Sequence, residues 1–192
     1  MSALVHFITH PDVQIDPAVP VPEWRLSARG RDRMAAMTGH DWVRGIGAIF
    51  SSTERKARDG AEILGAALLL SYDTHAGLGE NDRSATGYLK KDEFEAMADA
   101  FFARPHESVR GWERAVDAQA RVTAAMEDVL ARAAPDRTVA VVAHGAVGAL
   151  YLCHLKACAI SRSEDQPPTG GGNYYTFERA SRRLLHGWKS ID

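Results

Sequence analysis

Two histidines in this chain directly follow short apolar runs that are typical of buried β-strands. The run over residues 3–9 ends at His10, and the run over 139–143 ends at His144. In an open α/β sheet, ligands bind beyond the carboxyl ends of parallel strands, so two strands that end in imidazoles can direct both rings into one pocket. The sequence therefore predicts a paired-histidine site, which suits phosphoryl chemistry or a metal ion.

The composition limits the class of protein. The 192 residues are 45% hydrophobic and 25% charged, as expected for one globular domain. A formal net charge of -2 creates no field that would attract nucleic acid or an anionic membrane. No segment reaches the roughly 20 apolar residues of a membrane span, and the N-terminal run lacks a basic flank. We expect a cytoplasmic protein that binds neither nucleic acid nor membrane.

The two cysteines give a further indication of compartment. Cys153 and Cys158 are predicted to lie on a single helix and to point away from each other. This is poor geometry for a disulfide, so we expect two reduced thiols in the core.

Apolar periodicity predicts alternating strands and helices. Helices are predicted over 29–38 (with Ser27 as the N-cap), 54–69, 92–103, 112–133 and 146–157. Strands are predicted over 3–9, 46–51, 68–72, 139–143, 174–178 and 184–188. The order predicts an α/β fold with a mostly parallel sheet in a single domain, residues 1–192. Residues 73–112 are interpreted as an insert that covers the site, and a proline-rich, non-helical loop over 11–22 crosses its mouth.

Polar residues follow the second predicted strand at the same end of the sheet as His10. Ser52 closes this strand, and Arg55, Lys56 and Arg58 begin the next helix. Free amide groups and the helix dipole favour an anion there, so we interpret the segment as a phosphate seat. Basic runs are also common on solvated helix faces, and at least one of the three cations is expected to lie on such a face.

A carboxylate in the predicted insert can complete the site. Glu80 shares a loop with Asp82 and Arg83, where it could protonate a leaving oxygen. On local sequence alone, an exposed loop glutamate fits equally well.

Several short motifs occur in a definite order along the chain. They are Thr9-His10-Pro11, W-R-L-S-A-R-G over 24–30, S-S-T-E-R-K-A-R-D-G-A-E over 51–62, L-G-E over 78–80 and H-G-A over 144–146. In these motifs the chain resembles the histidine phosphatase superfamily, the phosphoglycerate-mutase-like proteins. The corresponding family motifs are R-H-G, W-x-L-(S/T)-x-x-G, S-S-x-x-x-R-A-x-x-T-A-E, L-x-E and H-G-G. The resemblance covers nearly the whole chain and implies a three-layer α/β/α sandwich.

The resemblance also implies roles for individual residues. His10 would accept the phosphoryl group, His144 would stabilise its oxygens, and Glu80 would be the general acid. The expected phosphate-binding side chains are Lys56, Arg83, Arg55 and Ser52. The family needs no metal, so no cofactor is expected; the expected partner is a small phosphorylated substrate, and homodimer formation is left open.

The departures from the family pattern concern positive charge. Thr9 replaces the arginine before the nucleophile, Pro11 replaces the following glycine, and Lys56 replaces the second arginine. Two guanidinium forks that would hold a phosphoryl group bidentately are therefore missing. Each preorganised donor of this kind contributes on the order of 3 kcal/mol to catalysis. Arg83 or Arg55 could restore the charge from another backbone position.

We therefore expect a metal-independent phosphomonoester hydrolase that acts through a phosphohistidine at His10. The alternative is a catalytically impaired relative that binds a phosphorylated ligand or a protein partner, which the three replacements favour. A third hypothesis is metal-dependent hydrolysis at His6, His10, Asp12 and His144, which are suitable ligand types without the dense spacing of metal sites. A mutase is less expected, because no extra basic residues are evident for a second phosphate.

Overall fold

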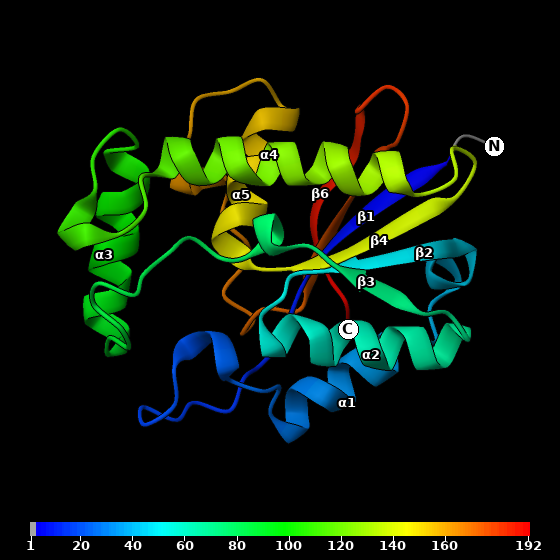
Figure 1. The fold of residues 1–192 in the computed structure, drawn as a ribbon, viewed down its shortest axis with the longest axis horizontal. Helices are drawn as coiled ribbons and strands as arrows, with labels where there is room; N and C mark the ends of the chain where they lie inside the picture. The colour runs from blue at the N-terminus through cyan, green and yellow to red at the C-terminus, as the bar shows by residue number, and fades with distance from the viewer. Residues whose placement is uncertain (1–2) are drawn as a thin grey trace.

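The computed structural model describes residues 3–192, which form a six-stranded sheet in the order β3-β2-β4-β1-β5-β6 (Figure 1). The strands are β1 Leu4–Thr9, β2 Ile46–Ser51, β3 Tyr72–Thr74, β4 Thr138–Ala143, β5 Asn173–Glu178 and β6 Leu184–Ser190. Strands β1 to β4 are parallel, whereas β5 and β6 are antiparallel additions at one edge. The prediction of a mostly parallel α/β sheet is confirmed.

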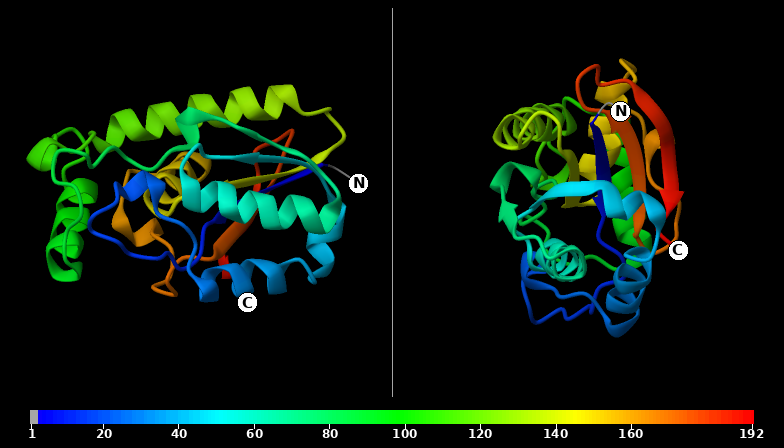
Figure 2. Two further views of the ribbon diagram at one scale, coloured as in Figure 1. Left: turned by 60° about the horizontal axis from the view of Figure 1, so that its bottom comes forward. Right: turned by 90° about the vertical axis from the view of Figure 1, so that its right-hand side faces the viewer.

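Helices cover both faces of the sheet. They are α1 Ala28–Met37, α2 Arg55–Leu68, α3 Lys91–Ala103, α4 Ala115–Arg132 and α5 Gly145–Leu155. Helices α1 and α2 pack on one face and α4 and α5 on the other, each pair over its own apolar cluster (Figure 1). Helix α3 lies beyond the end of the sheet, apart from both layers (Figure 2). The result is the expected three-layer sandwich.

The two central strands account for the positions of the histidines. Strand β4 is buried on both faces, because Val139 and Val141 pack under α4 and α5 while Ala140 and Val142 pack under α2. A strand buried on both faces needs a continuous apolar run, which is the pattern found in the sequence. Strands β1 and β4 are parallel neighbours, and the His10 amide donates to the carbonyl oxygen of Ala143 at 3.0 Å. Both histidines therefore lie side by side at the carboxyl ends of the two central strands.

Local predictions near the helix ends are confirmed in part. The Ser27 hydroxyl accepts a hydrogen bond from the Gly30 amide at 3.1 Å, as expected for the N-cap of α1. The predicted strand over 68–72 is wrong: Leu69 adopts a left-handed conformation, with φ of 56°, that ends α2, and β3 begins only at Tyr72. The proline-rich loop, expected to lack helix, contains a short 3-10 turn over Val21–Glu23.

The prediction for the cysteines is also corrected. Helix α5 ends at Leu155, so Cys158 lies beyond the helix and is exposed, and Cys153 alone is buried. Both are free thiols.

The segment between β3 and α4, predicted as a covering insert, contains α3 and the 3-10 turns Ala76–Leu78 and Val109–Gly111. Its aromatic residues form a separate apolar cluster around Phe101 and Trp112. Within residues 3–192, no helix combines the length and the apolar character needed to cross a membrane.

Candidate active site

The side chains of His10 and His144 face each other at the carboxyl ends of β1 and β4. Their ring centroids are 5.1 Å apart and the rings meet edge to face, at 70°. This short separation follows from the parallel pairing of the two strands, as the sequence predicts. A single ligand atom can therefore contact both rings.

The backbone fixes the tautomer of His10. Its Nδ1 lies 3.0 Å from the carbonyl oxygen of Pro11, which can only accept a hydrogen bond, so Nδ1 carries the proton and Nε2 keeps a lone pair. Burial, followed by the charge of Lys56, lowers the pKa of His10 to about 4. His10 is therefore a neutral imidazole at pH 7 with a nucleophilic Nε2.

His144 is fully buried and is held through one of its nitrogens. Its Nε2 lies 2.8 Å from the hydroxyl of Ser52 and 3.5 Å from the carboxylate of Glu54. Burial lowers the pKa of His144 well below its usual value, although the Glu54 charge opposes this shift. Within the described part of the chain, the buried Nδ1 has no hydrogen-bond partner. This nitrogen is available to a ligand.

Glu54 contacts both His144 and Lys56, although no role for it was predicted from the sequence. Its carboxylate accepts hydrogen bonds from the ammonium of Lys56 and from the amide of Glu80, the latter at 2.8 Å. Burial raises the pKa of the Glu54 carboxyl, but the neighbouring His144 and Lys56 outweigh burial and lower it to about 2. Glu54 is therefore ionised and balances the charge of Lys56. A glutamate at the start of a predicted helix resembles an ordinary surface residue, so the sequence contained no signal for this contact.

Lys56, predicted to bind phosphate, is buried and already has two partners. Besides Glu54, its ammonium donates to the carbonyl oxygen of Val21 at 3.0 Å. The pairing with Glu54 leaves Lys56 with little net charge to offer an anion.

Glu80 lies at the N-terminus of α5. Its carboxylate accepts hydrogen bonds from the amides of Ala146 and Val147, at 3.2 and 3.1 Å. Arg121 of α4 donates to backbone carbonyl oxygens of Gly77, Gly79 and Glu80 and so holds this loop in place. The predicted general acid thus caps the helix that begins after His144, and it also lines the adjoining cavity.

Two side chains of the same loop offer donors to the cavity. The guanidinium of Arg83 lies over the rings of Phe94 and Trp112, 5.1 and 5.6 Å from their centroids, and it takes part in none of the ion pairs found within residues 3–192. Asn81, which the sequence analysis did not single out, also lines the cavity, and its buried Nδ2 has no acceptor in the described chain. The loop after Glu80 therefore holds a cation without a carboxylate and an amide donor without a partner.

The other cations at the start of α2 lie elsewhere. The Nε of Arg55, a side chain predicted to bind phosphate, is paired with the carboxylate of the buried Asp59 at 2.7 Å. Arg58 is exposed and borders a small depression near β3.

The replacements around His10 have structural roles. The Thr9 hydroxyl donates to the Gln166 side chain at 2.7 Å and accepts from the Asn173 amide at 3.0 Å. Gly171, with φ of 78°, packs so closely that an added Cβ would lie 2.2 Å from the carbonyl oxygen of His10. The position that carries an arginine in the resembled motif thus joins β1 to the loop before β5.

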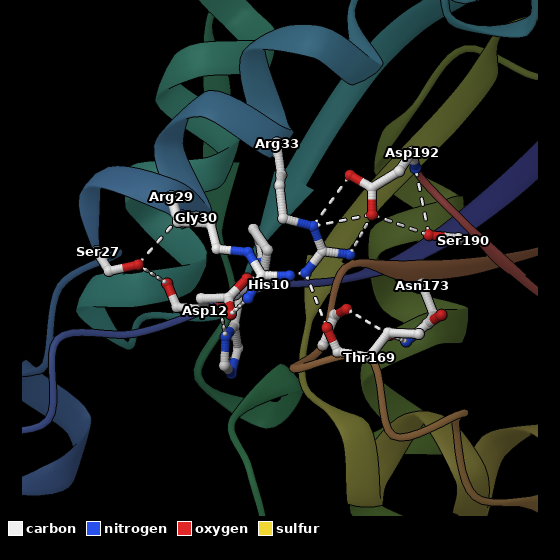
Figure 3. Close-up of polar contacts among 12 residues, drawn as sticks. His10, Asp12, Ser27, Arg29, Gly30, Arg33, Thr169, Asn173, Ser190 and Asp192 are labelled. Carbon is white, nitrogen blue, oxygen red and sulfur yellow. Dashed lines mark hydrogen bonds and ion pairs between the residues drawn. The ribbon is translucent and has the colours of Figure 1, made fainter.

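A buried arginine fixes the backbone after His10 from the other side. Arg33 of α1 donates to Asp12 at 2.8 Å and to Asp192 at 2.6 Å, and it lies between the two carboxylates in Figure 3. It also donates to the carbonyl oxygen of Thr169. Because Asp12 follows Pro11 directly, this network helps to hold the carbonyl that orients His10.

The residues of the metal hypothesis are dispersed. Asp12 is paired with Arg33, and His6 lies 2.9 Å from the hydroxyl of Thr176, with its ring against Trp42. In the described range, 3–192, no group of three or more His, Cys, Asp or Glu side chains is arranged to hold a metal ion.

A cavity of about 800 Å³ is lined by Glu80 and by Glu54, whose carboxylate lies 3.5 Å from His144; the histidines themselves do not line it. One wall comes from residues 15–24 and the other from residues 80–94 together with Trp112. The predicted loop and insert therefore meet over the site.

The family model of the histidine phosphatase superfamily (branch 1) matches residues 18–185 of this chain. The chain belongs to the histidine phosphatase superfamily. The match begins after His10, so it does not cover the Thr9-His10-Pro11 triplet. A comparison with curated protein sequences gives no match.

Solved structures share this family's fold across the whole chain. A mycobacterial glucosyl-3-phosphoglycerate phosphatase, in complex with inorganic phosphate, is 22% identical with a TM-score of 0.79, and the likeness covers 99% of each chain. YhfR from Bacillus stearothermophilus is 21% identical with a TM-score of 0.80, over 97% of this chain and 95% of its own. At these identities the likeness shows the fold alone.

Proposed function

We propose that this protein is a phosphomonoester hydrolase that acts through a phosphohistidine at His10. The observation that carries the proposal is the hydrogen bond from His10 Nδ1 to the Pro11 carbonyl oxygen, which leaves a lone pair on Nε2 of a ring whose centroid lies 5.1 Å from that of His144. Membership of the histidine phosphatase superfamily supports the same reaction. A small phosphorylated molecule is the proposed substrate.

In the first step, His10 Nε2 attacks phosphorus, and an N–P bond forms as the P–O bond to the leaving oxygen breaks. Glu80 gives its proton to that oxygen. Glu54 is unsuited to this role, because its pKa of about 2 keeps it ionised at neutral pH. A bound phosphoryl dianion favours protonated His144, whose free Nδ1 then donates to a phosphoryl oxygen.

In the second step, water gives a proton to Glu80 and attacks phosphorus. The N–P bond breaks, and phosphate and neutral His10 are released. Arg83 and Asn81 supply the donors to the phosphoryl oxygens that Thr9 and the paired Lys56 do not provide.

The test combines turnover and trapping with p-nitrophenyl phosphate as the probe. We expect hydrolysis that is unaffected by EDTA, and an acid-labile phosphoryl group on the quenched enzyme. His10→Ala should abolish both signals, whereas the control His106→Ala, which removes an exposed histidine, should retain them. Turnover by His10→Ala would disprove the phosphohistidine, and a loss of activity with EDTA that a divalent metal restores would favour metal-dependent hydrolysis.

One observation favours a second candidate, a relative that binds phosphorylated ligands without turnover. The carboxylate of Glu54 neutralises the ammonium of Lys56 beside the histidines, which weakens the stabilisation of a transferring phosphoryl group. This candidate predicts no hydrolysis by the wild-type protein, together with binding of inorganic phosphate or vanadate measured by calorimetry.

A further inference from the structure

The cavity beside the histidines is much larger than a phosphoryl group. Its volume of about 800 Å³ lies within the 300–1,000 Å³ that is common for sites of drug-sized ligands. The phosphoryl group would occupy only the end that contains Glu54, Glu80 and Arg83. The remaining volume is available to the group that leaves as the alcohol.

Aromatic rings from both walls surround this remaining volume. Trp24, in the loop after β1, lies 5.7 Å from Tyr88 of the opposite wall, with the rings tilted by 59°. Phe94 and Trp112, which line the same cavity, are 6.1 Å apart. Tyr88 is 41% exposed, so part of its surface is open to a ligand. Flat faces of this kind bind aromatic rings in offset or edge-to-face geometry.

The charged side chains of the cavity can hold a phosphoryl group beside its aromatic residues. Three carboxylates, Glu54, Glu80 and Asp82, line the cavity together with two cations, Arg83 and Lys91. The guanidinium of Arg83 lies over the rings of Phe94 and Trp112, so a phosphoryl group bound by Arg83 would lie next to aromatic side chains.

We propose that the substrates are phosphomonoesters of alcohols that bear a flat aromatic group, and that this group packs against the surface that Trp24 and Tyr88 form together. The inference rests on the proposed hydrolysis at His10 and specifies the substrate class of the same site. It separates such substrates from small sugar or glycerate phosphates, which would leave the aromatic walls uncovered.

The experiment compares three esters whose leaving alcohols have similar acidity: 2-naphthylmethyl, cyclohexylmethyl and ethyl phosphate. We expect kcat/KM to be at least about 100-fold higher for the naphthylmethyl than for the ethyl ester. It should also be about tenfold higher than for the cyclohexylmethyl ester, since aromatic pairing adds up to roughly this factor beyond the burial of apolar area.

Variants locate the binding surface. Tyr88→Leu should remove most of the preference for the naphthylmethyl over the cyclohexylmethyl ester, with little change for ethyl phosphate. Tyr88 is exposed, so this substitution should not affect folding. The control Tyr72→Leu removes a tyrosine outside the cavity, on β3, and should keep the preference.

The outcomes separate the inference from the proposed function. If the three esters are hydrolysed equally in a reaction that depends on His10, the aromatic substrate class is wrong and the hydrolase proposal stands. If no ester is hydrolysed, the hydrolase proposal fails, and binding is measured with the naphthylmethyl and cyclohexylmethyl phosphonates through the fluorescence of Trp24 and Trp112. Preferential, Tyr88-dependent binding of the naphthylmethyl phosphonate would then support the aromatic site, and equal binding would overturn it.

Discussion

The floor of the site and the wall above it differ in how their charges are satisfied. The floor consists of His10, His144, Glu54 and Lys56, where the buried ammonium and carboxylate are paired and both imidazoles are neutral at pH 7. The wall, residues 80–94 with Trp112, contains Arg83 outside any ion pair of the described chain and Asn81 with a buried, unpartnered Nδ2.

This difference indicates where an anion finds its donors. In the resembled family motifs, two arginines contribute from the floor, but here one position is Thr9 and the other is a lysine already paired with Glu54. Charge balanced inside the fold is not available to a ligand without the cost of breaking a buried pair. We therefore propose that the positive charge for anion binding comes from Arg83 of the wall, while the floor contributes the unpartnered Nδ1 of His144.

The largest expected effect comes from unbalancing the floor. Glu54→Gln leaves the buried Lys56 charge without a carboxylate, so the free energy of unfolding should fall by about 3 kcal/mol, as when one partner of a buried pair is removed. Inorganic phosphate should bind the variant more tightly than the wild type, because the Lys56 charge becomes available. Urea unfolding and calorimetry at pH 7 measure the two effects.

Glu107→Gln is the matched control, because Glu107 forms an exposed pair with Arg104 and its loss should change stability by less than about 1 kcal/mol. Unchanged stability and unchanged phosphate affinity in Glu54→Gln would show that the floor is not internally balanced.

The next effect tests the wall. Arg83→Ala should weaken the binding of vanadate or phosphate by about 1.5 to 3 kcal/mol, the range for a lost charge-assisted hydrogen bond. The melting temperature should change little, since Arg83 joins no ion pair in the described chain. Arg58→Ala removes the same charge from an exposed position and should leave affinity unchanged. If the two variants bind vanadate equally well, Arg83 does not contribute to the anion site.

The sequence predicted the floor more fully than the wall, for physical reasons. The sequence predicts the positions of His10 and His144 because strands buried on both faces need continuous apolar runs, and the carboxyl ends of neighbouring parallel strands lie side by side. The apolar run after α2 was assigned to a strand because helix ends and strands share such residues; only the left-handed Leu69 separates them.

Contacts between distant segments could not be predicted in this way. Glu54 follows β2 and contacts His144, which follows β4, 90 positions later in the chain. The lack of a partner for the Asn81 amide is likewise recognised only when its surroundings are known. Residue type alone does not distinguish these from surface positions. The cavity that Trp112 and Tyr88 share with Trp24 likewise depends on how the two loops meet, which the sequence does not show.

The dependence of stability on pH tests whether the fold keeps its buried histidines neutral. Burial, assisted by the charge of His186, lowers the pKa of His6 from 6.5 to about 4. The unfolded state therefore binds more protons between these pH values, and the stabilisation present above pH 6.5 is lost as pH falls toward 4. From pH 6.5 to 5, His6 alone should account for about 1.5 kcal/mol of lost stability.

His6→Gln, which can still bond to Thr176 but does not titrate, should show a correspondingly shallower decline in urea unfolding over this pH range. His106→Gln, at an exposed position, should decline like the wild type. Parallel curves for His6→Gln and the wild type would mean that His6 is not held neutral by the fold.

The smallest effect concerns Thr9, which links β1 to the segment before β5. Thr9→Val keeps the shape of the side chain but removes the bonds to Gln166 and to the Asn173 amide, so the free energy of unfolding should fall by about 1 to 2 kcal/mol. The affinity for vanadate should not change, because the proposed anion donors are Arg83, Asn81 and His144, whereas the Thr9 hydroxyl already has partners within the fold. A loss of vanadate binding as large as that in Arg83→Ala would place Thr9 among the ligand contacts and would contradict the view that the wall supplies the charge that the Thr9 position lacks.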